Sequence, residues 1–192
     1  NASAAKTEKL SSSLSNIEKG TATDEELMAA CKEFETYLVE QVIKNTKTVM
    51  ISKKLEEAIN AQINAEMWSA YLYLSMDMNF EDKGLSGIAN WFKIQFKEEQ
   101  DHATIFMNYL NSRGGRVLLR PIAEVETEWA TPLDAFKATL KHEQVVTSLI
   151  HDLYFLSEEE RDPATRSMLQ WFIDEQVEEE ETAKQLIDKL IM

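Results

Sequence analysis

The residues that turn or break a chain are scarce in this sequence, which has only 5 glycines and 3 prolines in 192 residues. β-Sandwiches and β-barrels join many short strands and need turn residues at short intervals. Regular elements must therefore be few and long here, and long segments carry apolar residues at steps of three and four, the period of an α-helix. The sequence predicts an all-α fold.

Turn signals divide the chain beyond residue 50 into four helical segments, predicted at about 52–80, 86–112, 131–156 and 162 to the terminus. Glycine follows the first two segments, and proline stands in the first turn of the last two, where it suits a helix start. Residues 116–131 are left as a long connection. Two short turns and one long crossover between the second and third helices are typical of a ferritin-like four-helix bundle.

The first 49 residues differ from the rest, because every tryptophan, histidine and proline of the chain lies beyond them. We therefore predict an appended segment, 1–49, ahead of a complete domain, 50–192. Residues 1–22 are rich in small and polar residues, which is typical of a mobile tail. A capping box then opens an amphipathic helix, predicted at about 23–47.

Charge and cysteine content exclude several functional classes. The net charge of −14, from 34 acidic and 20 basic residues, argues against a nucleic-acid partner. No stretch approaches the roughly 20 consecutive apolar residues of a membrane helix, so no membrane partner is expected. The single cysteine, Cys31, excludes an intramolecular disulfide and a four-cysteine metal site, and it favours a reducing, cytoplasmic setting.

Polar residues interrupt the apolar stripes of the four predicted helices at matching positions. A lone glutamate in the first helix precedes a pair of residues three apart in the second, and the third and fourth helices repeat this arrangement at the same spacing of 33. Residues at i and i+3 share a helix face, so both members of a pair can point toward one place in the core. The six residues are Glu66, Glu99, His102, Glu143, Gln176 and Glu179.

A cluster of glutamates and one histidine inside a bundle predicts a two-metal site. Carboxylates in a core are costly unless they are paired, hydrogen-bonded or bound to metal. Oxygen and imidazole ligands suit divalent iron, manganese or zinc, and open coordination positions would let dioxygen reach two irons. One Glu-x-x-His pair is present, whereas Gln176 and Glu179 replace the second, which favours iron that is processed and released.

Each residue taken alone has a simpler interpretation. A single Glu-x-x-His pair is common on helices, residues 178–181 resemble a solvated acidic face, and Tyr73 alone fits core packing. His142 and His151 are predicted to have surface or structural roles. The shared spacing across four helices is what favours a metal site.

Five stretches of the chain carry a family resemblance: Asn64–Trp68, Tyr71–Met76, Glu98–His102, Lys141–Glu143 and Asp174–Glu179. Residues 50–191 resemble a prokaryotic non-haem ferritin over nearly their whole length. The resemblance implies a homo-oligomeric iron-storage cage, usually of twenty-four subunits, without haem. It also implies that Fe(II) is oxidised with dioxygen or peroxide at a di-iron centre inside each subunit and that ferric mineral is stored in the cage.

The same resemblance implies roles for individual residues. Glu66, Glu99 and His102 would hold the first iron. Glu143 would hold the second iron, with Glu99 bridging the two. The other residues with implied roles are Gln176 and Glu179 beside the second iron, Tyr73 near the centre, and Glu98, Glu175 and Glu178 at a third iron position.

Three features depart from the family pattern. The family normally continues past this terminus into a short fifth helix, so a bundle that lacks this helix is expected. Arg166 and Leu169 stand where animal ferritins have acidic channel residues, so that iron route is not implied. Residues 31–42 resemble instead the N-terminal region of flagellar rod-binding proteins.

Related families differ from this chain at specific residues. Rubrerythrins need two Cys-x-x-Cys pairs, and bacterioferritins have a second Glu-x-x-His where this chain has Gln176 and Glu179. DNA-protecting miniferritins place their ligands across subunits, unlike the set predicted here within one bundle. A non-enzymatic alternative is a ferritin shell that serves as a fusion scaffold and displays residues 1–49.

Overall fold

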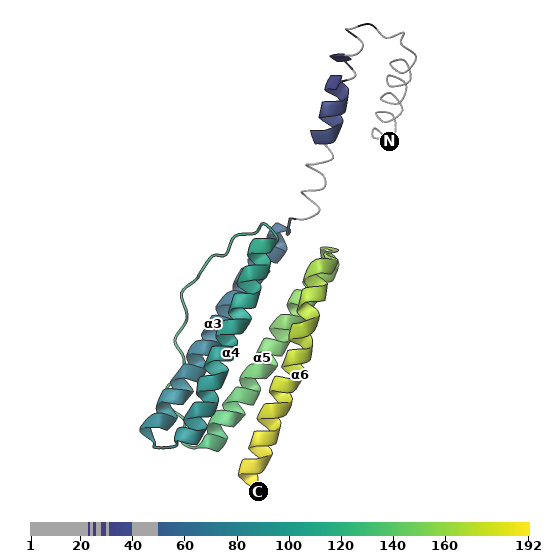
Figure 1. The fold of residues 1–192 in the computed structure, drawn as a ribbon. Coiled ribbons are helices and arrows are strands. Elements are labelled where there is room, and N and C mark those ends of the chain that lie inside the picture. Colours follow the sequence, from purple (N-terminus) through teal and green to yellow (C-terminus); the bar gives the residue numbers. More distant parts are fainter. Residues whose placement is uncertain (1–22, 24, 26–27, 30, 40–49) are drawn as a thin grey trace. The chain divides into compact units, whose positions relative to one another are not determined.

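The computed structural model describes residues 23, 25, 28–29, 31–39 and 50–192, and the chain divides into two units, Asn1–Met50 and Ile51–Met192 (Figure 1). In the first unit, residues 31–39 form a helix, which agrees with the centre of the helix predicted at 23–47. The predicted tail, 1–22, and the end of the predicted helix lie outside the described residues.

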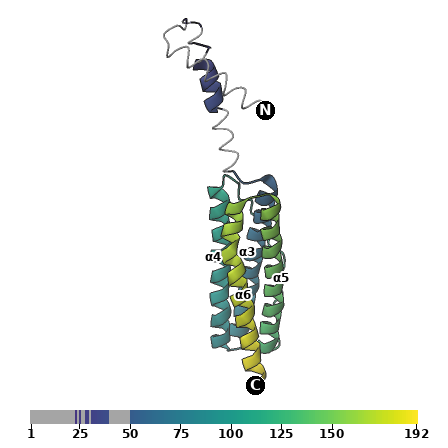
Figure 2. The same cartoon turned by 90° about the vertical axis from the view of Figure 1, so that its right-hand side faces the viewer.

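The second unit consists of four long helices, α3 (Lys53–Asp82), α4 (Ser86–Ser112), α5 (Pro132–Glu159) and α6 (Pro163–Ile191). Figures 1 and 2 show them running along one common direction, with the long connection from α4 to α5 lying beside α3. No strand occurs in the described part of the chain, so the predicted all-α bundle with one long crossover is confirmed. Among these described helices, none combines the length and apolar character needed to cross a membrane.

Local capping chemistry explains the helix ends. Thr131 Oγ1 accepts a hydrogen bond from the backbone N of Asp134 at 3.2 Å, and the Asp134 carboxylate accepts one from Thr131 N at 3.1 Å. This reciprocal pair starts α5. Gly84 and Gly114 follow α3 and α4 with φ of 70° each, a left-handed conformation that glycine adopts readily because it lacks Cβ.

Two apolar clusters fill the core of the bundle. In one, the rings of Phe106 and Phe172 stack with centroids 4.1 Å apart. In the other, Phe92 stacks on Phe80 at 5.7 Å and on Phe136 at 5.1 Å. On each helix the polar candidate residues fall between the segments that supply these two clusters. The candidates therefore form a polar layer in the middle of an apolar bundle.

Polar side chains of α3 form hydrogen bonds with the backbone of the long connection between α4 and α5. Asn60 donates from Nδ2 to Arg116 O at 2.9 Å and accepts at Oδ1 from Leu118 N at 2.6 Å. Farther along the helix, Ser75 Oγ donates to Glu126 O at 2.7 Å. These bonds satisfy backbone groups of a segment that has no ladder or helix of its own.

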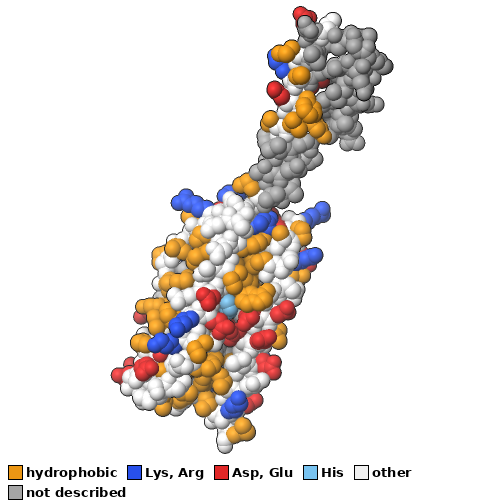
Figure 3. Space-filling model, viewed as in Figure 1, with side chains coloured by type: hydrophobic (Ala, Val, Ile, Leu, Met, Phe, Trp, Pro, Cys, Tyr) orange, Lys and Arg blue, Asp and Glu red, His pale blue; other side chains and the backbone are white. Residues whose placement is uncertain are grey.

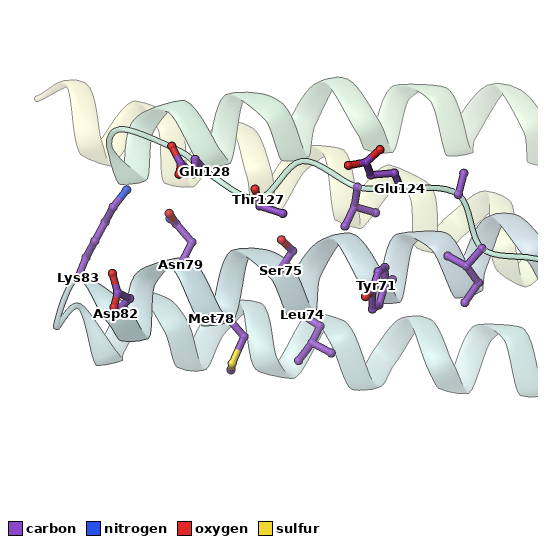
Figure 4. Close-up of a pocket in the computed structure, with 13 residues that line it drawn as sticks. Tyr71, Leu74, Ser75, Met78, Asn79, Asp82, Lys83, Glu124, Thr127 and Glu128 are labelled. Carbon is purple, nitrogen blue, oxygen red and sulfur yellow. The ribbon is translucent and has the colours of Figure 1, made fainter.

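A surface groove of about 920 Å³ is lined by residues of α3 and of the connection. Ser75 and Asn79 point from α3 toward the connection along this groove (Figure 4). None of the candidate metal ligands lines it. The groove is therefore a feature of the outer face of α3, separate from the polar layer in the core.

Asp162 joins the end of α4 to the start of α6. Its carboxylate accepts hydrogen bonds from both terminal nitrogens of Arg113, at 3.1 and 2.8 Å, and from the backbone N of Thr165 at 3.1 Å. Burial acts to raise the pKa of Asp162, but the bonds from Arg113 and Thr165 outweigh burial and lower that pKa below its usual 3.8.

Replacing Asp162 by alanine is expected to lower the free energy of unfolding by about 2–4 kcal/mol, because a helix cap and the partner of a part-buried guanidinium are lost together. Since the folded-state pKa is lowered, this stability is present above pH 3.8 and is lost as the pH falls through the folded-state value. Urea unfolding near neutral pH measures the effect, and Asp152→Ala on the exposed face of α5 is the control. Equal losses in the two variants would contradict the assignment.

Candidate metal centre

Glu66, Glu99 and His102 come together in the polar layer. Each offers one ligand atom, and these three atoms lie within 4.8 Å of one another. Their residues are only 1%, 2% and 5% exposed. α3 supplies the first residue, and one face of α4 supplies the other two, as their spacing of three predicts. This geometry can hold one metal ion.

Two carboxylate oxygens of this cluster, Oε2 of Glu66 and Oε2 of Glu99, are buried and accept no hydrogen bond from a protein donor while both carboxyls are ionised. The two carboxyls can pair with each other only if one of them holds a proton. The other oxygen of Glu66 accepts a hydrogen bond from Gln62 Nε2 at 2.8 Å. His102 Nδ1 lies 3.5 Å from Glu99 Oε2. A buried acceptor without a partner is rare in folded proteins, because it loses its hydration without replacement. Here a cation would supply that replacement.

The electrostatics of the cluster favour either a proton or a cation. Burial, followed by the charge of Glu99, raises the pKa of Glu66 well above its usual value. Burial, followed by the charge of Glu143, does the same to the pKa of Glu99. A metal ion that replaces the protons would remove this penalty, so binding is expected to release protons.

Glu143 of α5 lies beside this cluster with both carboxylate oxygens engaged. Oε1 accepts a short hydrogen bond from the hydroxyl of Tyr73, and Oε2 accepts one from Gln176 Nε2 at 3.1 Å. Burial raises the pKa of Glu143, although these two bonds act to lower it. Burial and the charge of Glu143 raise the pKa of Tyr73 well above 10, so the phenol keeps its proton and donates.

Glu179 of α6 is the fourth buried carboxyl of the layer, and it is 8% exposed. Gln95 Nε2 donates to both of its oxygens, at 3.2 and 3.1 Å. Gln95 and Gln62 are not among the residues predicted from the sequence. Each precedes a proposed ligand by one helical turn on a core-facing stripe, so their spacing from Glu99 and Glu66 is the signal that could have identified them.

A second group of possible ligands lies toward the surface. Ligand atoms of Glu98, His102 and Glu175 lie within 4.8 Å of one another, and both glutamates are half-buried. Figure 3 shows acidic side chains gathered around a histidine on the visible face of the bundle. Of the three residues predicted for a third iron, the group contains Glu98 and Glu175. Glu178 is exposed and is not part of it.

The two histidines assigned to surface or structural roles differ in their surroundings. His151 is exposed on α5. His142 is partly buried, and its Nε2 lies 2.8 Å from Ser69 Oγ on α3. Burial lowers the pKa of His142 to about 4, so the imidazole is neutral near pH 7. Neither histidine belongs to a group of possible metal ligands within the described residues.

The metal-free protein is expected to lose stability as the pH rises, because burial and then the charge of Glu143 raise the pKa of Glu179 from 4.5 to about 7. A raised folded-state pKa contributes stability that is complete below pH 4.5 and is lost as the pH rises through about 7. The difference amounts to about 3 kcal/mol. Urea unfolding of wild type and Glu179→Gln across this range measures it. The variant should show a flatter profile, and identical profiles would contradict the burial of a titrating Glu179.

Known proteins resemble the four-helix unit of this chain. The model of the ferritin family, described as a ferritin-like domain, matches residues 56–192. The bacterial non-heme ferritin of Bacteroides fragilis (strain 638R) is 47% identical over 141 residues, which cover 73% of this chain and 89% of that protein. The bacterial non-heme ferritin of Staphylococcus aureus (strain USA300) is 39% identical over 131 residues, 68% of this chain and 79% of that protein.

A solved structure shows the same likeness in three dimensions. The open pore ferritin of Archaeoglobus fulgidus has a TM-score of 0.72 and 47% sequence identity, and the match covers 73% of this chain and 86% of that one. The family match begins at residue 56, so it gives no support to the resemblance between residues 31–42 and flagellar rod-binding proteins.

Proposed function

The chain belongs to the ferritin family, as a non-haem iron-storage protein with ferroxidase activity, and we propose that it oxidises Fe(II) at one di-iron centre inside each subunit. The observation that carries the proposal is the buried cluster of Glu66, Glu99 and His102, in which two carboxylate oxygens have no partner. Such a cluster is costly in an empty core and favourable around a cation.

The first Fe(II) would bind to Glu66, Glu99 and His102. Gln62 supports this assignment, because its hydrogen bond occupies one oxygen of Glu66 and leaves the other oxygen available to a metal ion. A hydrogen-bonded partner such as Gln62 fixes the orientation of a metal ligand. Glu99 would bridge to the second Fe(II), since its other charged neighbours include Glu143 and Glu179.

The second Fe(II) would bind to Glu143, with Glu99 bridging and Glu179 nearby. Gln176 would orient Glu143, because its amide donates to the Glu143 carboxylate. Tyr73 would do the same from the opposite oxygen. The second position has no histidine, so its oxygen ligands would hold iron less firmly than the first position, in keeping with iron that is oxidised and passed on.

The redox step uses iron as substrate. Two Fe(II) ions each give up one electron, and dioxygen takes up both electrons and two protons to become hydrogen peroxide. With peroxide as the oxidant, the same two electrons and two protons yield two waters. The neighbouring carboxyls keep both ions in one buried layer, where the oxidant can reach the pair together.

Further assignments extend the proposal to the whole particle. Glu98 and Glu175 would receive a third iron near the surface, with Glu178 as a charged neighbour of Glu175, and His102 would belong to both this group and the buried one. Residues 50–192 would be the functional domain, assembled as a cage of twenty-four subunits that stores ferric mineral, and residues 1–49 would be an appended segment. The cytoplasm is the proposed location, because Cys31 is the single cysteine.

Aerobic addition of Fe(II), followed by near-ultraviolet absorbance and paired with light scattering, tests this function. Fast oxidation by a large particle is the expected result. Fast oxidation by a small species would support ferroxidase activity and contradict a storage cage. No oxidation above buffer, in a folded protein, would contradict the catalytic proposal and favour a shell that displays residues 1–49.

A further inference from the structure

A hydrogen bond outside the proposed ligand set joins α3 to α5 beside the metal centre. Ser69 Oγ and His142 Nε2 are 2.8 Å apart. Ser69 is fully buried, and His142 is partly buried. The same two helices are also joined by the hydrogen bond from Tyr73 to Glu143. Ser69 precedes Tyr73 by one helical turn, and His142 directly precedes Glu143, so the two bonds are neighbours.

The imidazole of His142 also packs against aromatic rings of α3. Its ring meets Tyr73 edge-on, with centroids 6.1 Å apart and planes at 74°. Its centroid also lies 5.1 Å from that of the Trp68 ring, with the two planes at 54°. Tyr73 is fully buried, and Phe92 stacks on it at 6.2 Å. The His142 ring therefore forms part of the packing around the Tyr73 ring, and its orientation affects that packing.

The hydroxyl of Ser69 has two partners within hydrogen-bonding distance. Its single hydrogen can go to the backbone O of Ala65, 3.1 Å from Oγ, in which case Oγ accepts from His142 Nε2–H, or it can go to an unprotonated Nε2 at 2.8 Å. In both arrangements the bond between Oγ and Nε2 fixes the tilt of the imidazole ring.

We propose that the Ser69–His142 pair is a positioning contact that holds Tyr73 against Glu143 and thereby sets the affinity of the second iron position. The proposal rests on the proposed function, because it takes Glu143 as a ligand of that iron. Neither Ser69 nor His142 touches the metal. Without the Ser69–His142 bond, the His142 ring could change its tilt. The Tyr73 ring would then lose its fixed edge contact, and the Tyr73 hydroxyl would no longer hold the Glu143 carboxylate in one orientation. The ligands of the first iron position, Glu66, Glu99 and His102, take no part in this chain of contacts.

Anaerobic calorimetric titration with Co(II) alone separates the two positions. We expect Tyr73→Phe, which removes an outer partner of Glu143, to raise the second dissociation constant by about 10–100-fold. Ser69→Ala and His142→Leu act through Tyr73 and should raise the same constant by about 10-fold, at the lower end of that range. The first dissociation constant should stay unchanged. His142→Gln keeps an amide that can donate to Ser69 Oγ or accept from it and should restore the second constant. His151→Gln on the exposed face of the same helix is the matched control.

A double-mutant cycle shows whether the pair acts through Tyr73. In a Tyr73→Phe background, Ser69→Ala should add nothing to the loss of the second Co(II), because the hydroxyl that it positions is already gone. Additive losses would overturn the proposal, and so would equal weakening of both positions or an unchanged second constant in the folded variants. A wild-type protein that binds fewer than two Co(II) per chain would instead contradict the proposed di-iron centre itself.

Discussion

Glu99→Gln is expected to remove fast Fe(II) oxidation, with a loss of initial rate of about 100-fold or more. The substitution keeps the size of the side chain and removes the charge that would bridge both irons. Loss of an outer partner of a metal ligand already costs about 10–100-fold, so loss of a shared direct ligand should cost at least as much. Stopped-flow absorbance after mixing with two Fe(II) per chain measures the rate.

The same variant should be more stable than wild type when metal is absent. Burial and the charge of Glu143 raise the pKa of Glu99 well above its usual value, so a neutral amide relieves a penalty at neutral pH. Glu57→Gln on the exposed face of α3 is the matched control and should change neither property. Rapid oxidation in the Glu99 variant would contradict its assignment as the bridge.

Phe106→Ala is expected to have the largest effect on stability, about 3–5 kcal/mol of the free energy of unfolding. Phe106 is fully buried and stacks on Phe172 with ring centroids 4.1 Å apart, so its removal leaves a cavity between α4 and α6. The cluster around these rings lies directly beside the polar layer. Urea unfolding of the metal-free protein at neutral pH measures the change.

Phe34→Ala provides the control for that measurement. Phe34 is 48% exposed and belongs to the other unit of the chain, so its removal should leave the stability of the bundle unchanged. Similar losses in the two variants would show that the Phe106–Phe172 stack does not hold the bundle together. A large loss confined to Phe106→Ala is the result that the packing predicts.

The helices of the bundle could be predicted closely because residues at or next to each helix end determine where the helix begins or stops. Thr131 and Asp162 cap α5 and α6 with their own side chains, and Gly84 and Gly114 accept the left-handed backbone that ends α3 and α4. Such signals need no knowledge of distant parts of the chain. The course of the connection could not be predicted in the same way, because it depends on Asn60 and other side chains of a different helix.

Buried carboxylates could be predicted where charge stands out against an apolar background, as at Glu66 and Glu143. Neutral side chains that donate hydrogen bonds to these carboxylates do not stand out in the same way. Gln62 and Gln95 are ordinary polar residues in sequence, and their function becomes visible only when the helices place each amide on a glutamate. His142 shows the same limit, since only the pairing of α3 with α5 shows that its ring meets Ser69 in the interior.

Anomalous diffraction at the iron edge, from crystals soaked anaerobically with Fe(II), tests the central claim most directly. Two peaks about 3.5–4 Å apart are expected inside each bundle. One should lie among Glu66, Glu99 and His102, and the other beside Glu143, with Glu99 in contact with both. A bundle interior without peaks, or peaks bound only by exposed acidic residues, would contradict a di-iron centre within the subunit.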